Sequence, residues 1–137
     1  MKAILLAAGF GTRLLPITEN IPKCLVRINQ LTMLEFWLRK LELNSIACIV
    51  VNTHHFADKV EHEIGKIYVR NKIEIFHEEV LLGTAGTLIA NITSNLNSDV
   101  LVVHCDNYSG IDLEDFLRAH NNRRQDCVVT MAWGSSW

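Results

Sequence analysis

The feature that most constrains the fold is an unbroken apolar stretch at residues 3–8 that leads directly into a polar loop containing two glycines. A strand with water on one face alternates apolar and polar side chains, whereas this stretch has no polar position. We therefore predict a strand buried on both faces. The stretch is short and ends in a glycine turn, so it suits a buried strand better than the core of a signal peptide.

Strand and helix patterns alternate along the rest of the chain. Apolar or alternating runs predict further strands at residues 46–52, 72–77, 99–105 and 126–132. Helical spacing of apolar side chains predicts helices over residues 32–41, 56–67, 84–91 and 112–120. This order predicts a three-layer α/β/α fold with a mainly parallel sheet and helices on both faces. Ligands of such sheets bind beyond the carboxyl ends of the strands, so the polar loops after the first and fourth strands are expected to meet there.

Two of these helices carry a capping signal. Thr32 and Glu35 have the spacing of a capping box, in which the first side chain caps the helix and the second reaches back to it. Asp112 is the predicted cap of the last helix.

Composition and charge exclude several classes of function. The 137 residues are 49% hydrophobic and 20% charged, with a net charge of −2 and no long run of one sign. Proteins that bind nucleic acids or anionic membranes usually carry a basic stripe, so we expect neither partner. No segment approaches the roughly 20 apolar residues that span a bilayer, so we expect a cytoplasmic protein. An anionic ligand must then be held by local groups.

The loop after the first strand has the composition of a phosphate-binding turn. Gly9 and Gly11 let the backbone turn tightly and bring its N–H groups against phosphate oxygens, although a glycine pair also serves ordinary turns. A dinucleotide fingerprint would need a third glycine where Leu14 stands, and a P-loop would end in Gly-Lys-Ser/Thr. This loop instead ends in Arg13 and is followed ten residues later by Lys23, two cations suited to phosphates.

The complete pattern resembles the signature of the sugar-phosphate nucleotidyltransferases, LAAGxGTRLxP followed by PKxL. The chain reads LAAGFGTRLLP at residues 6–16 and PKCL at residues 22–25. Two later segments continue the resemblance. EEVLLGTAG at residues 78–86 looks like the family's base-recognition segment, and HCDN at residues 104–107 looks like the strand end that supplies an aspartate to the metal.

The resemblance implies that residues 1–132 form the N-terminal, Rossmann-like nucleotide-binding domain of such an enzyme. The GTAG form is most similar to mannose-1-phosphate guanylyltransferases, while N-acetylmuramate-1-phosphate uridylyltransferases and heptose-phosphate guanylyltransferases remain open. GTP is therefore the favoured donor, with UTP and dTTP as alternatives, and a sugar-1-phosphate is the acceptor. The product would be a nucleotide sugar.

The resemblance also implies roles for individual residues. Arg13 would hold the β- and γ-phosphates that leave as pyrophosphate, and Lys23 would contact the α-phosphate and the sugar phosphate. Asp106 would bind Mg²⁺, although an aspartate at a strand end also serves as a turn or cap residue. The nucleotide-binding residues implied are Leu6, Ala7, Ala8, Gly9, Gly11, Thr12, Glu78, Gly83 and Thr84.

Some of these assignments have competitors. Glu79 competes with Glu78 for the base contact, and a solvated charge is the simplest alternative for either. His54 and His55 can line the pocket or begin the next helix, and we favour the helix.

Metal binding by cysteine and histidine is disfavoured. His104 and Cys105 are neighbours on a strand, so their side chains point to opposite faces and do not suit one zinc ion. The four cysteines show no paired spacing and are expected to be reduced core thiols.

The resemblance ends near residue 132. Residues 133–137 have no clear counterpart in the family, and the second metal-binding aspartate and the sugar-contacting segments of relatives are absent. We therefore expect the nucleotide-binding domain to be incomplete, with an exposed sheet edge that favours pairing with another copy. The alternative hypothesis is a nucleotide-binding domain without turnover, either a relic or an interaction subunit.

Overall fold

The structure is a computed structural model of the chain. It describes residues 1–44, 46–92, 99–124 and 129–131. The chain divides into two compact units, Met1–Asn107 and Tyr108–Trp137. The first unit contains the sheet and every residue of the candidate site.

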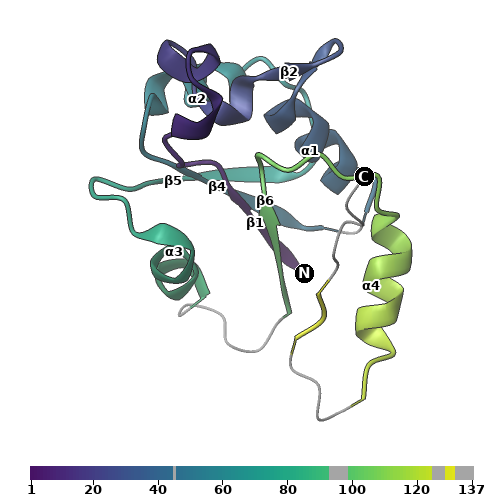
Figure 1. The fold of residues 1–137 in the computed structure, drawn as a ribbon. Helices are drawn as coiled ribbons and strands as arrows, with labels where there is room; N and C mark the ends of the chain where they lie inside the picture. The colour runs from purple at the N-terminus through teal and green to yellow at the C-terminus, as the bar shows by residue number, and fades with distance from the viewer. Residues whose placement is uncertain (45, 93–98, 125–128, 132–137) are drawn as a thin grey trace. The chain divides into compact units, whose positions relative to one another are not determined.

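The first unit is built on a four-stranded parallel sheet (Figure 1). Its strands are β1 (Lys2–Leu6), β4 (Cys48–Thr53), β5 (Lys72–His77) and β6 (Val100–His104). Their order is β5-β4-β1-β6, so β1 lies between β4 and β6. The expected mainly parallel sheet is confirmed, and β5 and β6 are its outer strands. Pairing of two copies through such an edge stays a prediction.

Helices cover both faces of this sheet. They are α1 (Met33–Glu42), α2 (Ala57–Ile64) and α3 (Gly83–Ile92). The chain passes from β1 through α1 to β4 and through α2 to β5, then returns through α3 to β6 on the other side of β1. Because parallel crossovers are right-handed, this reversal places α3 on the face opposite α1 and α2, as Figure 1 shows. The three-layer prediction is confirmed, and the reversal marks a switch point between β1 and β6.

The core explains the unbroken apolar stretch. Ala3, Ile4 and Leu5 are fully buried, although successive side chains of a strand point to opposite faces. The buried core also contains Leu34 and Leu38 of α1. Residues 3–5 include no polar side chain because neither face of the strand meets water there.

The start of α1 fulfils half of the predicted capping box. The Thr32 hydroxyl oxygen accepts a hydrogen bond from the backbone N–H of Glu35 at 3.1 Å, so the cap is confirmed. The Glu35 carboxylate does not reach back. It accepts two hydrogen bonds from the guanidinium of Arg39, at 2.9 and 2.7 Å. A charged donor one turn away offers this carboxylate a stronger partner than a backbone amide does.

Other local structure departs from the prediction. Two short strands, β2 (Arg27–Ile28) and β3 (Leu31–Thr32), form an antiparallel hairpin that we did not predict. Three turns of 3-10 helix, Thr12–Leu14, Ile17–Glu19 and Lys23–Leu25, shape the long loop after β1.

The second unit contains α4 (Leu113–Asn121), whose predicted cap is confirmed. The Asp112 carboxylate accepts a hydrogen bond from the backbone N–H of Asp115 at 3.0 Å. Most of the strand predicted at 126–132, and all of the tail at 133–137, lies outside the described residues, and residues 129–131 form no strand. None of the helices in the described part of the chain is long and apolar enough to cross a membrane.

Candidate functional site

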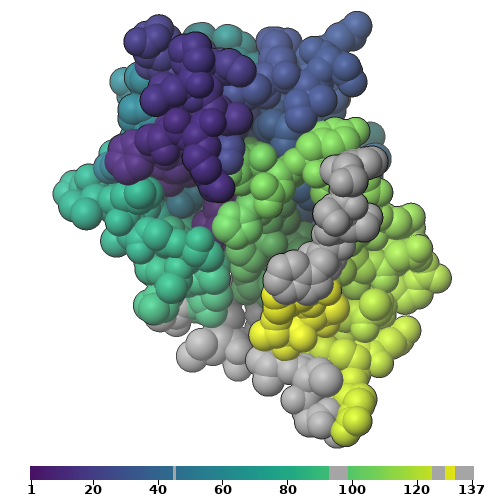
Figure 2. All heavy atoms as spheres, viewed as in Figure 1, coloured from purple at the N-terminus to yellow at the C-terminus, as the bar shows by residue number. Residues whose placement is uncertain are grey.

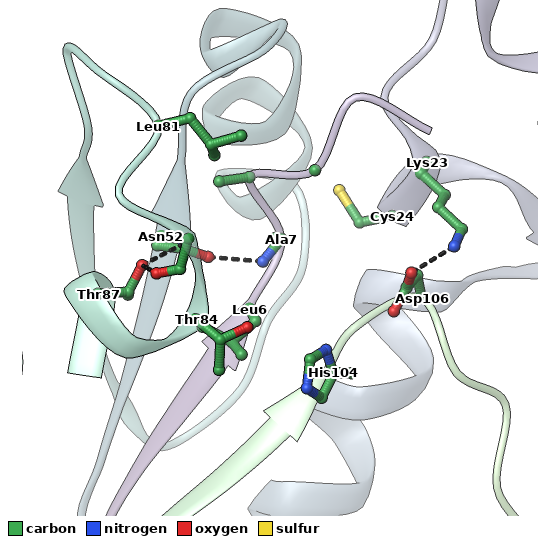
Figure 3. Close-up of a pocket in the computed structure, with 13 residues that line it drawn as sticks. Leu6, Ala7, Lys23, Cys24, Asn52, Leu81, Thr84, Thr87, His104 and Asp106 are labelled. Carbon is green, nitrogen blue, oxygen red and sulfur yellow. Dashed lines mark hydrogen bonds and ion pairs between the residues drawn. The ribbon is translucent and has the colours of Figure 1, made fainter. Parts of the chain in front are cut away.

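A cavity of about 180 Å³ lies at the carboxyl ends of β1, β4 and β6, beside the switch point (Figure 3). The glycine loop forms one side and the start of α3 forms another. In Figure 2, the purple N-terminal segment borders the teal segment that includes α3 and the green segment that includes β6. The cavity is lined by Leu6, Ala7, Ala8, Gly9, Lys23, Cys24, Asn52, Leu81, Gly83, Thr84, Thr87, His104 and Asp106.

Most of the residues singled out in the sequence lie in this wall. Those that line the cavity are Leu6, Ala7, Ala8, Gly9, Lys23, Gly83, Thr84 and Asp106. Four others lie outside the wall, namely Gly11, Thr12, Arg13 and Glu78. Thr12 and Arg13 are exposed on the first turn of 3-10 helix. The structure therefore brings the lysine and the aspartate together at the glycine loop and places the arginine beyond the cavity.

Lys23 and Asp106 form an ion pair at the edge of the cavity (Figure 3). The Lys23 ammonium donates to the Asp106 carboxylate, and the two side chains are 20% and 29% exposed. Lys23 opens a 3-10 turn after the glycine loop, and Asp106 follows the end of β6. Each charge neutralises the other. A bound phosphate would compete with Asp106 for the ammonium, and a bound cation would compete with Lys23 for the carboxylate.

Gly11 supports the approach of Lys23 rather than lining the cavity. Its φ of 70° is in the left-handed region, where residues with a Cβ are strained. A Cβ on Gly11 would lie 3.0 Å from the Lys23 Cβ and 3.1 Å from the Thr18 Cγ2. The hydroxyl of Thr18 also donates to the Gly11 carbonyl at 2.7 Å. The glycine is needed because another part of the loop packs closely against it.

The first turn of the loop offers free backbone donors. Within the described residues, no hydrogen bond engages the N–H groups of Ala8, Gly9 or Phe10. Ala8 and Gly9 line the cavity, so two of these donors belong to its wall. Backbone N–H groups in such a turn can bind an anion.

A buried polar network lies behind the cavity wall. Asn52 is 3% exposed, Glu78 is 2% exposed and Thr87 is fully buried. The Asn52 side chain accepts from the Ala7 N–H at 2.6 Å and donates to the Glu78 carboxylate at 2.9 Å. The Thr87 hydroxyl donates to the same carboxylate oxygen. The other carboxylate oxygen accepts from the Leu82 N–H at 2.9 Å.

These contacts change the interpretation of Glu78. The sequence predicted a base contact, but both carboxylate oxygens have protein partners, and the side chain is not part of the cavity wall. Burial raises the pKa of Glu78, while hydrogen bonds from Asn52, Thr87 and the Leu82 N–H lower it by more, so its pKa lies below the ordinary value. Glu78 is therefore a buried, ionised carboxylate. Its competitor Glu79 is exposed.

The two histidines after β4 lie outside the cavity wall. They do not begin the helix, as we had favoured, because α2 begins at Ala57 with Phe56 as its N-terminal cap. Their rings contact the Phe10 ring, with centroids 5.6 Å away for His54 and 5.3 Å for His55. His54 Nδ1 also lies 2.8 Å from the Glu78 carbonyl oxygen.

Two of the three described cysteines are core residues, whereas Cys48 is only partly buried, contrary to the prediction. Cys24 and Cys105 are buried, as predicted for core thiols, and burial raises the pKa of the Cys105 thiol. The described residues contain no group of three or more histidine, cysteine or acidic side chains arranged for a metal. Cys127 lies outside the described residues.

Sequence reasoning missed several residues of the wall. Asn52 and Thr87 were not predicted, and His104 was considered only as a zinc ligand. One signal for Asn52 was available, because a polar side chain ends the apolar run of β4 at the edge where ligands bind. Nothing in the local pattern marks Thr87, whose partner Glu78 lies on another segment.

Comparison with known proteins agrees with the motif. Residues 2–135 match the model of the nucleotidyl transferase family. A putative mannose-1-phosphate guanyltransferase of Sulfolobus acidocaldarius is 31% identical over 131 residues, which cover 95% of this chain and 36% of that protein. A choline-phosphate cytidylyltransferase of Streptococcus pneumoniae is 41% identical over 70 residues, which cover 51% of this chain and 31% of that protein.

A solved structure supports the same conclusion. The crystal structure of HddC from Yersinia pseudotuberculosis complexed with GMP-PN superimposes with a TM-score of 0.74 at 27% identity, covering 88% of this chain and 54% of that one. The chain thus spans about a third of the length of the two relatives named above and about half of this structural neighbour. With its family model matched along nearly its whole length, the chain belongs to the nucleotidyl transferase family.

Proposed function

We propose that this chain is the nucleotide-binding part of a sugar-phosphate nucleotidyltransferase that uses GTP. The ion pair between Lys23 and Asp106, beside open backbone amides at the switch point of the sheet, is the observation that carries this proposal. It brings an ammonium, backbone N–H groups and a carboxylate to the wall of one small cavity. Such an arrangement suits the polyphosphate of a nucleotide.

The transfer itself needs positioning and charge neutralisation. An oxygen of the sugar-1-phosphate attacks the α-phosphorus of the triphosphate, and the bond from that phosphorus to the bridging oxygen breaks, releasing pyrophosphate. Lys23 would contact the α-phosphate and the sugar phosphate, where negative charge increases. Arg13, which lies beyond the cavity wall, would hold the leaving phosphates. Removing one such charged donor lowers a rate by roughly 10² to 10³.

The residues present fit a magnesium ion. Magnesium bound with nucleotides is usually held by one or two carboxylates, by phosphate oxygens and by water. Asp106 offers one partly exposed carboxylate in the cavity wall. Bound there, the ion would neutralise phosphate charge beside Lys23.

The guanine preference has support from two named proteins. The relative from Sulfolobus is a putative guanyltransferase, and the HddC structure contains GMP-PN. The cytidylyltransferase from Streptococcus belongs to the same set of relatives, so the base is the least constrained part of the proposal. UTP and dTTP are the alternative donors.

A second function is favoured by one observation. Asp106 is the sole carboxylate among the described residues that line the cavity, and nucleotidyl transfer is often served by a second acidic ligand. A domain that binds a nucleotide without turnover would need no second carboxylate.

Pyrophosphate release separates the two functions. The purified chain is incubated with Mg²⁺ and GTP, UTP, dTTP or CTP, each with mannose-1-phosphate and other sugar phosphates, and nucleotide binding is measured in parallel. Pyrophosphate release with one pair of nucleoside triphosphate and sugar phosphate supports the transferase, provided that the Lys23→Ala variant does not release it. Binding without release selects the binding domain, and the absence of both would refute the proposal.

A further inference from the structure

The position of Glu78 in the fold indicates a structural role. It follows the last residue of β5, is 2% exposed and lies outside the cavity wall. Its backbone is anchored as well, because its N–H donates to the Thr53 carbonyl at 2.8 Å. With its backbone N–H bonded to Thr53 and its side chain buried, Glu78 is not free to turn toward a ligand.

The carboxylate determines which way the Asn52 amide faces. The Asn52 Nδ2 group donates to Glu78 Oε1 at 2.9 Å and to Thr87 Oγ1 at 3.3 Å. With the amide nitrogen facing these acceptors, the amide oxygen faces the Ala7 N–H, from which it accepts at 2.6 Å. An amide turned the other way would bring its NH₂ group against the Ala7 N–H, which is also a donor. The orientation that holds Ala7 therefore needs an acceptor at Glu78.

The same carboxylate also binds the segment at the start of α3, which forms the opposite wall of the cavity. Glu78 Oε2 accepts from the Leu82 N–H at 2.9 Å, just before Gly83 begins α3. The Thr87 hydroxyl donates to Oε1 from the second turn of that helix. One buried carboxylate thus connects the first turn of the glycine loop with the start of α3, and these two segments face each other across the cavity.

We infer that Glu78 is a positioning residue, which sets the glycine loop through Asn52 and the start of α3 through Leu82 and Thr87, and does not contact the base. This inference rests on the proposed nucleotide binding at the same cavity. A residue that contacts the base discriminates between nucleotides. A residue that shapes the phosphate-binding loop affects all nucleotides alike, since their phosphates are identical.

Glu78→Gln tests this directly. Glutamine has nearly the same shape but only one oxygen, so either Asn52 and Thr87 or the Leu82 N–H faces an NH₂ group instead of an acceptor. Glu61→Gln is the control, because it removes the same charge at an exposed position of α2 that does not line the cavity.

Two measurements are made on each variant of the full chain. The first is the hydrogen-exchange rate of the Ala7 and Leu82 amides in the free protein, each relative to the Ile4 amide of β1. The second is the Kd for GTP, UTP, CTP and dTTP. For Glu78→Gln we expect exchange of the Ala7 amide or of the Leu82 amide, whichever loses its support, to accelerate roughly tenfold, as for one lost buried hydrogen bond, and all four Kd values to rise by a common factor. Glu61→Gln should change neither.

A change in the ratio between bases with unchanged exchange at both Ala7 and Leu82 would overturn the inference, as would no change in either measurement. If the wild-type chain binds none of the four nucleotides, the proposed function fails, while exchange at Ala7 and Leu82 still decides whether Glu78 positions the two segments. Should Glu78→Gln fail to fold, Thr87→Val and Thr87→Ser replace it. The valine variant should accelerate Ala7 exchange, and the serine variant, which keeps the hydroxyl, should restore the wild-type rate. Equal rates in both would count against the network.

Discussion

The Lys23 ammonium is paired with the Asp106 carboxylate, 83 residues further along the chain. The pair joins the end of the glycine loop to the residues that follow β6, across the switch point of the sheet. Both groups belong to the wall of one cavity, so each charge is balanced before any ligand arrives. This balance makes the effect of removing one partner depend on whether a divalent cation is present.

Asp106→Asn should therefore have opposite effects with and without Mg²⁺. Without the ion, the variant removes the carboxylate that competes for Lys23, so its affinity for GTP should exceed that of the wild type by a few-fold to roughly tenfold. With Mg²⁺, the lost ligand should make its affinity lower than that of the wild type. Calorimetric titration with GTP in EDTA and in Mg²⁺ measures both. The same ordering of the two proteins under both conditions would contradict the roles given to this pair.

Alanine substitutions at three glycines should separate the cost of a strained backbone from the cost of a steric contact of the added Cβ. Gly11→Ala places a side chain at a positive φ and against Lys23, so we expect a loss of stability of roughly 1–3 kcal/mol. Gly83→Ala has a similar φ of 68° but no neighbour within 4 Å, so its loss should be smaller. Gly9 has neither constraint and is the control. Urea denaturation of the three variants gives the order, and a Gly9→Ala loss equal to that of Gly11→Ala would refute this account of the loop.

The N-terminal cap of α1 should contribute more to the free energy of unfolding than the ion pair on the surface of that helix does. Thr32→Ala removes the acceptor for the Glu35 N–H and should lower the free energy of unfolding by about 1 kcal/mol. Glu35→Gln weakens only the exposed pair with Arg39 and should lower it by no more than about 0.5 kcal/mol. Thermal and urea unfolding of both variants measure the difference. A larger loss in Glu35→Gln would indicate that the complete capping box forms in solution.

Glu78 should make stability depend on pH in the acidic range. Its pKa in the folded protein lies below the ordinary value of 4.5, so the unfolded chain takes up the proton first as the pH falls. The stabilisation by this carboxylate is therefore complete above the ordinary value and is lost as the pH falls through the lowered one. The free energy of unfolding of the wild type minus that of Glu78→Gln should shrink between about pH 6 and about pH 3. A difference that grows on acidification would show that the pKa is raised.

Local patterns were enough for most of the fold. The bounds of β5 were predicted as observed, because its run is flanked by turn residues, and the cap at Thr32 needs only residues near it in the sequence. The pairing of Glu35 with Arg39 was missed because two local partners compete for one carboxylate. The hairpin of β2 and β3 is only two residues long on each side, which is too short for a periodic pattern.

The site was predictable where it follows the motif. Lys23, Asp106 and the first residues of the loop were identified because their spacing is distinctive. The orientation of Glu78 was not, since it depends on Asn52 and Thr87, which come from other segments and meet it only in the folded chain. A carboxylate before a glycine looks the same in sequence whether it faces a ligand or the core.

The central claim is that GTP binds in the cavity between the glycine loop and α3. The most direct test is a titration of the isotope-labelled chain with GTP and Mg²⁺, followed by amide chemical shifts. We predict saturable shifts that are largest at Ala8, Gly9 and Thr84, and that Lys23→Ala weakens this binding at least tenfold while the exposed Lys66→Ala does not. Shifts confined to other parts of the chain, or equal affinities in the two variants, would contradict the account.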